Sequence, residues 1–186
     1  DLSMSFRYGL QAAPPRLAGL LPQRPVVLRP RGSRTVTAKA LQGAVVTGAG
    51  SGIGQALALA LAAQGLHVLA VGRRREALMR TRLASEASAG KVEDLPADIS
   101  GDSGRRAVAE RVTELCSDGG MSGLSFVVHN AAIMGEVGCL EELSPEGFRE
   151  ALAINVEAPV FLTQALLPQL RASHGRVLHI SSGAAH

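Results

Sequence analysis

One glycine-rich stretch, Thr47 to Gly54, most constrains what this 186-residue chain can fold into. It reads T-G-A-G-S-G-I-G and follows a short apolar, β-branched run at residues 44–46, which predicts a buried strand. Strong helix formers occupy residues 55–64, and Gly65 then predicts the end of a helix. A backbone that turns between a strand and a helix in this way passes close to a phosphate and points free N–H groups at it.

The spacing of the glycines excludes two common phosphate-binding motifs. They fall at positions 48, 50, 52 and 54, so the strict G-x-G-x-x-G pattern does not fit, and no Gly-Lys-Ser/Thr follows for a P-loop. A side chain at Gly48, Gly52 or Gly54 is expected to clash with the turn or to displace the ligand. A glycine cluster alone also fits a flexible turn, but the flanking strand and helix favour a nucleotide-binding loop.

From about residue 41 onward, predicted strands alternate with predicted helices. Further strands are expected at 66–71, 92–95, 124–128 and 176–180. Helices are expected at 74–84, at 103–116, and from Ser144-Pro145 to about 170, where Pro159 and Pro168 would kink or split the helix. This alternation predicts an α/β fold with a doubly wound parallel sheet, and neither an internal repeat nor a second domain is visible.

The first 40 residues differ in composition from the rest. They are rich in arginine and proline and contain one acidic residue, a composition that resembles a mitochondrial or plastid targeting segment. The same composition fits a disordered extension without any address. The overall pI of about 9.4 arises from this leader, because residues 41–186 contain 12 basic and 15 acidic residues. A nucleic-acid partner therefore has no support in the predicted domain.

Several functional classes find no support in the composition. No uninterrupted apolar run reaches the roughly 18 residues that a membrane span needs, so no span is expected. Cys116 and Cys139 are the only cysteines, which indicates neither a disulfide framework nor a metal site and fits a reducing compartment. The histidines lack metal-ligand spacing, so no metal is expected. No G-x-S-x-G elbow for a hydrolase occurs.

The T-G-x-x-x-G-I-G pattern resembles the cofactor loop of the short-chain dehydrogenase/reductases. The resemblance extends over residues 41–186 and implies a Rossmann-like domain that binds a nicotinamide dinucleotide. It places Gly48, Ser51, Gly52, Ile53 and Gly54 at the cofactor. The sequence S-S-G-A-A at residues 181–185 also resembles that of the branch that contains benzil reductase and sepiapterin reductase.

The end of the second predicted strand indicates which dinucleotide is preferred. A carboxylate there would bind the ribose 2′-OH of NAD, whereas a cation suits the 2′-phosphate of NADP. This chain has Gly72-Arg73-Arg74-Arg75 and no acid at the turn. Three arginines at a helix start oppose the helix dipole, so a nearby anion would help to explain them. We therefore expect NADP(H), with Arg73 as the first phosphate contact and Arg74 as the next.

The resemblance implies further nucleotide contacts beyond the third and fourth strands. Asp98-Ile99 resembles the pair that contacts the adenine, although an Asp at this place also fits a helix cap. His129-Asn130-Ala131-Ala132-Ile133 looks like the family's N-N-A-G motif, with His and Ile at two of its positions. Asn130 can satisfy open backbone groups at a strand-to-loop junction.

Two residues are candidates for catalysis by resemblance. Asn155 matches the Asn that helps to hold a water in the family's proton relay, and a mid-helix Asn is a poor helix former that suggests a specific partner. Ser182 matches the catalytic Ser, although alone it would fit an ordinary turn. The family's Y-x-x-x-K should follow shortly after Ser182, but the sequence stops at His186, and the only tyrosine is Tyr8 in the leader.

We therefore expect residues 41–186 to be the cofactor-binding part of a longer reductase, or a truncated product that is itself inactive. The predicted function is NADP(H)-dependent hydride transfer between nicotinamide and a small-molecule carbonyl or secondary alcohol. The alternative is a non-catalytic nucleotide-binding or interaction protein. The full-length form is expected to be a homo-oligomer.

Overall fold

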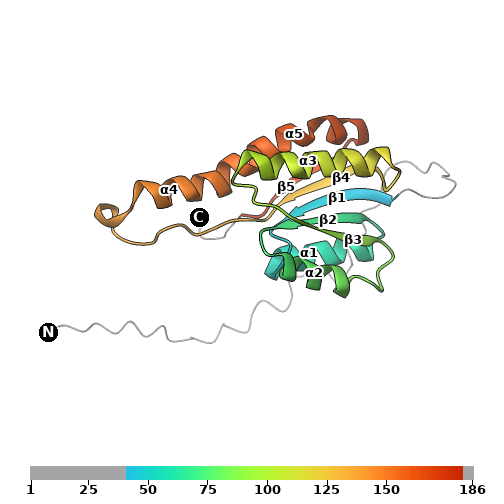
Figure 1. Ribbon diagram of the computed structural model, residues 1–186, viewed down its shortest axis with the longest axis horizontal. Helices are drawn as coiled ribbons and strands as arrows, with labels where there is room; N and C mark the ends of the chain where they lie inside the picture. The colour runs from blue at the N-terminus through green and yellow to red at the C-terminus, as the bar shows by residue number, and fades with distance from the viewer. Residues whose placement is uncertain (1–40, 182–186) are drawn as a thin grey trace, which may run out of the picture. The chain divides into compact units, whose positions relative to one another are not determined.

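A parallel β-sheet organises the computed structural model, which describes residues 41–181 (Figure 1). The elements are β1 (Leu41–Thr47), α1 (Gly52–Ala63), β2 (His67–Gly72), α2 (Arg75–Ala84), β3 (Lys91–Pro96), α3 (Asp102–Ser117), β4 (Met121–His129), η1 (Leu140–Glu142), α4 (Pro145–Leu152), η2 (Ala153–Glu157), α5 (Ala158–Ser173) and β5 (Arg176–His179). The strands lie in the order β3-β2-β1-β4-β5, and every neighbouring pair is parallel. The predicted doubly wound α/β fold is therefore confirmed. The expected leader, residues 1–40, lies outside the described residues.

Alternate side chains along β1, β2 and β4 supply two hydrophobic cores, one on each face of the sheet. In β1, Val45 belongs to one core, while Ala44 and Val46 belong to the other. Helices α3 and α5 cover the Val45 face, and α1 and α2 cover the opposite face (Figure 1). Because both faces are covered, the central strands β1 and β2 are mostly apolar along their buried length instead of alternating with polar residues.

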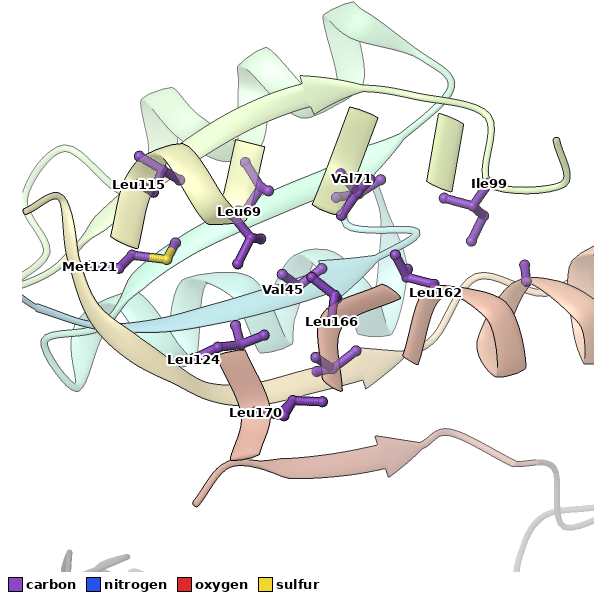
Figure 2. Close-up of a cluster of buried hydrophobic side chains, with 14 residues drawn as sticks. Val45, Leu69, Val71, Ile99, Leu115, Met121, Leu124, Leu162, Leu166 and Leu170 are labelled. Atoms are coloured by element: carbon purple, nitrogen blue, oxygen red, sulfur yellow. The ribbon is translucent and has the colours of Figure 1, made fainter. Parts of the chain in front are cut away.

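The larger core lies beneath α3 and α5 (Figure 2). Leu162, Leu166 and Leu170 recur every four residues, so that one stripe of α5 is buried against the sheet. Leu115 of α3 packs into the same core. Burying each leucine side chain stabilises the fold by about 1.5–3 kcal/mol, which makes this stripe the main attachment of α5.

Residues 145–173 form a helix that is interrupted by the π-helical segment η2. The interruption predicted from the two prolines falls directly before Pro159, whereas Pro168 lies inside α5. Proline has no N–H and its ring crowds the preceding turn, which favours a wider turn at this point.

This helix also bears on the expectation that the chain has no membrane span. Within residues 41–181, Pro145–Ser173 is one helix that is long and apolar enough to cross a membrane by length and composition. Its apolar stretch is not an uninterrupted run in the sequence, because Glu157 lies within it. In the fold, the leucines of α5 pack on the sheet, whereas Val160 and Phe161 of the same helix are exposed.

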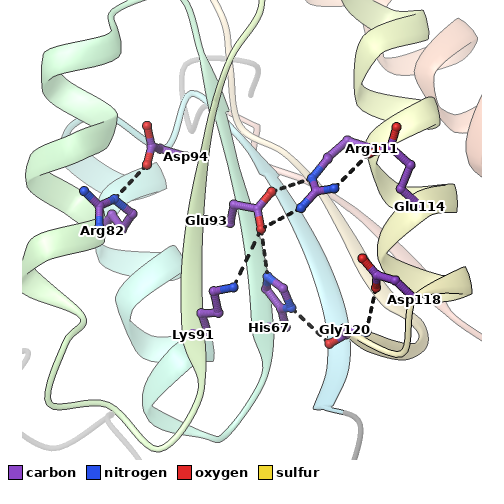
Figure 3. A network of polar contacts seen from close by, with 9 residues as sticks. All are labelled: His67, Arg82, Lys91, Glu93, Asp94, Arg111, Glu114, Asp118 and Gly120. Atoms are coloured by element: carbon purple, nitrogen blue, oxygen red, sulfur yellow. Dashed lines mark hydrogen bonds and ion pairs between the residues drawn. The ribbon is translucent and has the colours of Figure 1, made fainter.

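A polar network links the amino-terminal ends of β2 and β3 to α3 and to the residue before β4 (Figure 3). It lies at the opposite end of the strands from the glycine-rich loop. Glu93 of β3 accepts hydrogen bonds from Arg111 of α3, with Nε at 2.6 Å and Nη2 at 3.2 Å. His67 of β2 lies with Nε2 3.5 Å from Glu93 and Nδ1 3.0 Å from the carbonyl oxygen of Gly120. Burial acts to raise the pKa of Glu93, but the hydrogen bonds and charge of Arg111 outweigh it and hold that pKa below its ordinary value.

Candidate functional site

The glycine-rich loop connects the carboxyl end of β1 to α1. Gly48 has a φ of 69° and Gly52 a φ of 54°, which side chains other than glycine rarely adopt. A Cβ at Gly54 would lie against the carbonyl oxygen of Gly48 and the side chain of Asn130, whereas a Cβ at Gly52 would meet no protein atom. The expected clash with the turn thus occurs at Gly54, whereas a Cβ at Gly48 would meet Asn130 and Ala131 after β4. At Gly52 the constraint is the backbone conformation.

Helix α1 begins without a capping side chain. Ser51, its N-cap residue, makes no side-chain hydrogen bond to the helix backbone, and the first turn contains no acidic residue. The first N–H groups of the helix are therefore not satisfied by side-chain caps. A helix start of this kind offers donors and the positive end of the helix dipole to an anion such as a phosphate.

Thr47 joins the loop to the end of β4. Its hydroxyl accepts hydrogen bonds from the backbone N–H groups of Asn130 and Ala131, both at 3.1 Å, and donates to the carbonyl oxygen of Val128 at 3.3 Å. The side-chain Nδ2 of Asn130 donates to the carbonyl oxygen of Thr47 at 3.0 Å. Asn130 therefore holds the loop against β4 by satisfying its backbone.

A cavity of about 310 Å³ opens at the carboxyl ends of the strands. It lies where the chain order reverses between β1 and β4, which is where open parallel sheets bind ligands. The predicted nucleotide contacts that line it are Gly48, Ser51, Arg73, Arg74, Asp98, Ile99, Asn130 and Ala131. The other three, Gly52, Ile53 and Gly54, do not line it and lie in the first turn of α1. The fold thus brings residues from four strand ends to one place.

One end of this cavity is basic. Arg73 and Arg74 directly follow β2, and both line the cavity, whereas the neighbouring Arg75 does not. Arg74 donates a hydrogen bond from Nη2 to Oγ of Ser51 at 3.3 Å, so its guanidinium reaches from the start of α2 to the glycine-rich loop. Guanidinium groups bind phosphate oxygens with charge-assisted hydrogen bonds, so this end suits a phosphate.

Asp98 and Ile99 form the wall of the cavity beyond β3. The Asp98 carboxylate accepts hydrogen bonds from the hydroxyl of Ser100 at 2.8 Å and from its backbone N–H at 3.0 Å. These bonds, with a smaller effect from the charge of Arg73, hold the pKa of Asp98 below its ordinary value. The alternative of a helix cap is wrong, because Gly101 is the N-cap residue of α3.

The two candidate catalytic residues are placed differently. Asn155 lies in η2, and its amide pairs with the backbone of Ile133 in the loop after β4, accepting from N–H at 3.0 Å and donating to the carbonyl oxygen at 2.8 Å. Both ends of the amide are thereby used to hold that loop. Ser182 lies outside the described residues.

Comparison with known proteins identifies the family to which this site belongs. Residues 42–186 match the family model described as short chain dehydrogenase. The chain belongs to the short-chain dehydrogenase family. A 3beta-hydroxysteroid dehydrogenase of Mediterraneibacter gnavus is 31% identical over 140 residues, which cover 75% of this chain and 49% of the relative. A human relative, dehydrogenase/reductase SDR family member 2, mitochondrial, is 30% identical over 143 residues, covering 77% and 49%. The chain spans about half the length of these relatives.

Solved structures of short-chain dehydrogenases share the fold. An L-sorbose reductase from Gluconobacter frateurii, complexed with NADPH and L-sorbose, has a TM-score of 0.70 and 30% identity, covering 78% of this chain and 54% of that one. A metagenomic short-chain oxidoreductase in complex with NADP has a TM-score of 0.67 and 31% identity, covering 76% and 62%. The predicted family is thus confirmed.

His129, the departure from the Asn of the short-chain dehydrogenase motif, is a buried neutral histidine. Its side chain is almost fully buried, with Nε2 2.7 Å from Oγ1 of Thr163 in α5 and its ring 4.8 Å from that of His179. Burial, and secondarily the charge of His179, lower the pKa of His129 to about 4. Its Nδ1 has no hydrogen-bond partner among the described residues.

Sequence reasoning gave no role to several residues of the short-chain dehydrogenase site, among them Thr47 and Ile154. Thr47 is the first residue of the motif, and its signal in the sequence is a hydroxyl at the end of a buried strand. Ile154 lines the cavity, a place that depends on the turn of η2 and gave no signal in the sequence. Among residues 41–181, no three His, Cys, Asp or Glu side chains gather closely enough to hold a metal ion.

Proposed function

We propose that this chain binds NADP(H) in the cavity and forms the cofactor-binding part of a reductase acting on a carbonyl or secondary alcohol. The observation that carries the proposal is the pair of guanidinium groups at the end of β2, with Arg74 joined to Ser51 across the cavity. Cations at this position suit a ribose 2′-phosphate, whereas an NAD site has a carboxylate there. The NADP and NADPH bound by the two structural relatives support the same preference.

The nicotinamide would supply the hydride, and residues at the carboxyl ends of the strands would hold the substrate. In this proposal the hydroxyl of Ser182 holds the oxygen of the carbonyl or alcohol. Asn155 acts as a positioning residue, because its side chain holds the backbone of Ile133 beside the cavity. The resemblance to the branch that contains benzil reductase and sepiapterin reductase stays a prediction.

Titration of the 186-residue chain with NADPH and NADH tests the nucleotide proposal. Arg73→Ala and Arg74→Ala remove the two cations that line the cavity, and Arg75→Ala is a matched control from the same arginine run that does not line it. A charge-assisted hydrogen bond contributes about 1.5–3 kcal/mol, so each of the first two variants should weaken NADPH about 10- to 100-fold. NADH affinity should change less than about 2-fold, because NADH has no 2′-phosphate.

Three outcomes would argue against the proposal. One is a parent chain that is folded but binds neither nucleotide. Another is equal affinity for NADH and NADPH in the parent. The third is a loss of NADPH affinity in Arg75→Ala as large as that in Arg74→Ala, because general surface charge would then explain the preference.

We also propose that the full-length protein self-associates through the outer face of α4, η2 and α5. Phe148, Leu152, Val156 and Val160 are all exposed and recur every four residues, which makes one apolar stripe on this face. Light scattering of the full-length protein should show a dimer or larger assembly, and Val160→Glu should dissociate it. A full-length protein that is monomeric at micromolar concentration would contradict the proposal.

For residues 1–40 we propose an organelle address, mitochondrion or plastid, from their arginine-rich and acid-poor composition. One human relative is mitochondrial by its name, which supports the first of the two. Residues 1–40 fused to a fluorescent protein should direct it to the organelle. Diffuse fluorescence would favour a plain extension.

A further inference from the structure

A buried hydroxyl beneath the glycine-rich loop has no role in the site described above. Thr81 lies in α2 and is fully buried. Its Oγ1 donates to the carbonyl oxygen of Ala49 in the loop at 2.9 Å and accepts a hydrogen bond from Nε2 of Gln55 in α1 at 3.1 Å. The carbonyl oxygen of Ala77 in its own helix is a more distant acceptor, at 3.2 Å. Thr81 therefore links the loop to both helices on this face.

The same β2–α2 unit holds the Ala49 peptide from both sides. The N–H of Ala49 donates to the carbonyl oxygen of Val71 in β2 at 3.2 Å, and the carbonyl oxygen of Ala49 accepts from the Thr81 hydroxyl. A Cβ at the next residue, Gly50, would lie 2.9 Å from Cβ of Ala77, so the loop backbone rests directly on α2. Three contacts, with Val71 of β2 and with Thr81 and Ala77 of α2, thus define the position of the loop.

We propose that Thr81 is a positioning residue of the nucleotide site, whose hydroxyl holds the glycine-rich loop against α2. The proposal rests on the NADP(H) binding proposed above. A nucleotide with a pyrophosphate and a 2′-phosphate contacts the loop and the arginines at the same time, so the loop must be held at the correct distance from Arg73 and Arg74. Thr81 does not line the cavity, so it acts on the nucleotide through the Ala49 backbone.

The chain contains a second threonine with the same local bonds but without the loop. Thr113 of α3 donates to the carbonyl oxygen of Ala109 in its own helix at 2.9 Å and accepts from Nε2 of Gln169 at 2.8 Å. It lies on the α3–α5 side of the sheet, away from the glycine-rich loop. Thr113 is exposed, whereas Thr81 is buried, so Thr113→Val controls for the loss of the same hydroxyl and its local bonds and not for burial.

NADPH titration of the 186-residue chain and its variants tests this role. The chain has no tryptophan, so the emission of the nucleotide can be followed without tryptophan emission from the protein. Thr81→Val leaves the Ala49 carbonyl and the Gln55 amide without a buried partner, and it should weaken NADPH binding about 5- to 30-fold. Thr81→Ser retains the hydroxyl and should bind within about 2-fold of the parent. Thr113→Val should bind like the parent.

Hydrogen exchange of the nucleotide-free chain gives a readout that does not depend on binding. The Ala49 amide, which is bonded to Val71, should exchange about 5- to 30-fold faster in Thr81→Val and at the parent rate in Thr81→Ser. Titrations are made below the unfolding transition of each variant, so that a loss of global stability does not count as a loss of affinity.

Each result decides the proposal. Parent-like NADPH affinity or parent-like Ala49 exchange in Thr81→Val would overturn it, and so would equal losses in Thr81→Ser and Thr81→Val. If Thr81→Val does not fold, Gln55→Met removes only the donor that orients the hydroxyl, and it should weaken NADPH about 2- to 10-fold. No change in that variant would also overturn the proposal. A folded parent that binds neither nucleotide would refute the proposed function, and the exchange data alone would then decide whether Thr81 holds the loop.

Discussion

The buried histidine His129 should make the fold sensitive to mild acid. His129 lies between the sheet and α5, with its Nε2 at Thr163 and its ring beside His179 of β5. Burial first, and the charge of His179 second, lower the pKa of His129 from its ordinary 6.5 to about 4. Protonation would place a charge in a site where Nδ1 finds no partner among the described residues.

The direction of the effect follows from which state binds the proton. Between pH 6.5 and about 4 the unfolded chain holds a proton at this residue and the folded chain does not, so stability falls as the pH falls. Above pH 6.5 His129 is neutral in both states, so no stability is lost to its protonation. The whole shift corresponds to about 3 kcal/mol, of which about 2 kcal/mol should be lost between pH 7.5 and pH 5.

Urea unfolding at pH 7.5, 6.5, 5.5 and 5 measures this contribution. His129→Gln is neutral at every pH and can still bond to Thr163, so its free energy of unfolding should be about 2 kcal/mol less pH-dependent over the range than that of the parent. His179→Gln removes the smaller cause and should retain most of the pH dependence. His174→Asn is the control, because His174 is exposed and has a φ of 52°, which asparagine tolerates.

One result would refute this reasoning. That result is an equal loss of stability in the parent and in His129→Gln from pH 7.5 to pH 5, which would show that His129 is not buried as a neutral side chain. The carboxylates Glu93, Asp98 and Glu136 do not confuse the comparison, since their pKa values lie below their ordinary values and they titrate below this range.

Three further predictions concern the frame around the site. Glu93→Gln should lower the free energy of unfolding by about 2 kcal/mol, because it weakens the pairing with Arg111. Lys91→Met should change it by less than about 0.5 kcal/mol, since the Lys91 ammonium is exposed and lies 3.9 Å from the Glu93 carboxylate. Equal losses of the two variants in urea unfolding would contradict this prediction. Leu166→Ala should cost about 2–5 kcal/mol in the same assay, and a loss below 1 kcal/mol would mean that α5 is not anchored there. Gly54→Ala should cost about 1–3 kcal/mol and lower NADPH affinity, because its Cβ meets the Gly48 carbonyl; a variant that binds NADPH normally would argue against this tight loop.

The order of the fold could be predicted because strand and helix signals are local in sequence. The expected strands at 66–71 and 176–180 agree with β2 and β5 to within a residue. The expected start of β4 at residue 124 was wrong, because the strand begins at Met121. Gly123, with a φ of 147°, stands where the pairing with β1 shifts register, and a glycine at such an irregularity interrupts the apolar pattern.

The candidate site was predictable only where its residues form a contiguous motif. The loop and the arginine run could be named from spacing, because a strand end brings them to the ligand edge whatever the rest of the chain does. Asn155 could be named but its partner could not, since Ile133 lies 22 residues away and meets it only through the turn of η2. The structure therefore assigns to its side chain a holding role that the motif did not specify.

Residues that support the loop from beneath gave the weakest signal. Thr81 reads as a modest helix former, and its contact with Ala49 spans 32 residues and two packed elements. One signal was nevertheless present. Thr81 lies four residues after Ala77, on the stripe that faces the sheet, and a hydroxyl on a buried stripe requires a hydrogen-bond partner. The helix can supply one acceptor through Ala77, so the sequence leaves open whether a second partner exists. Only the packing of the loop on α2 decides that the hydroxyl serves the glycine-rich loop as well.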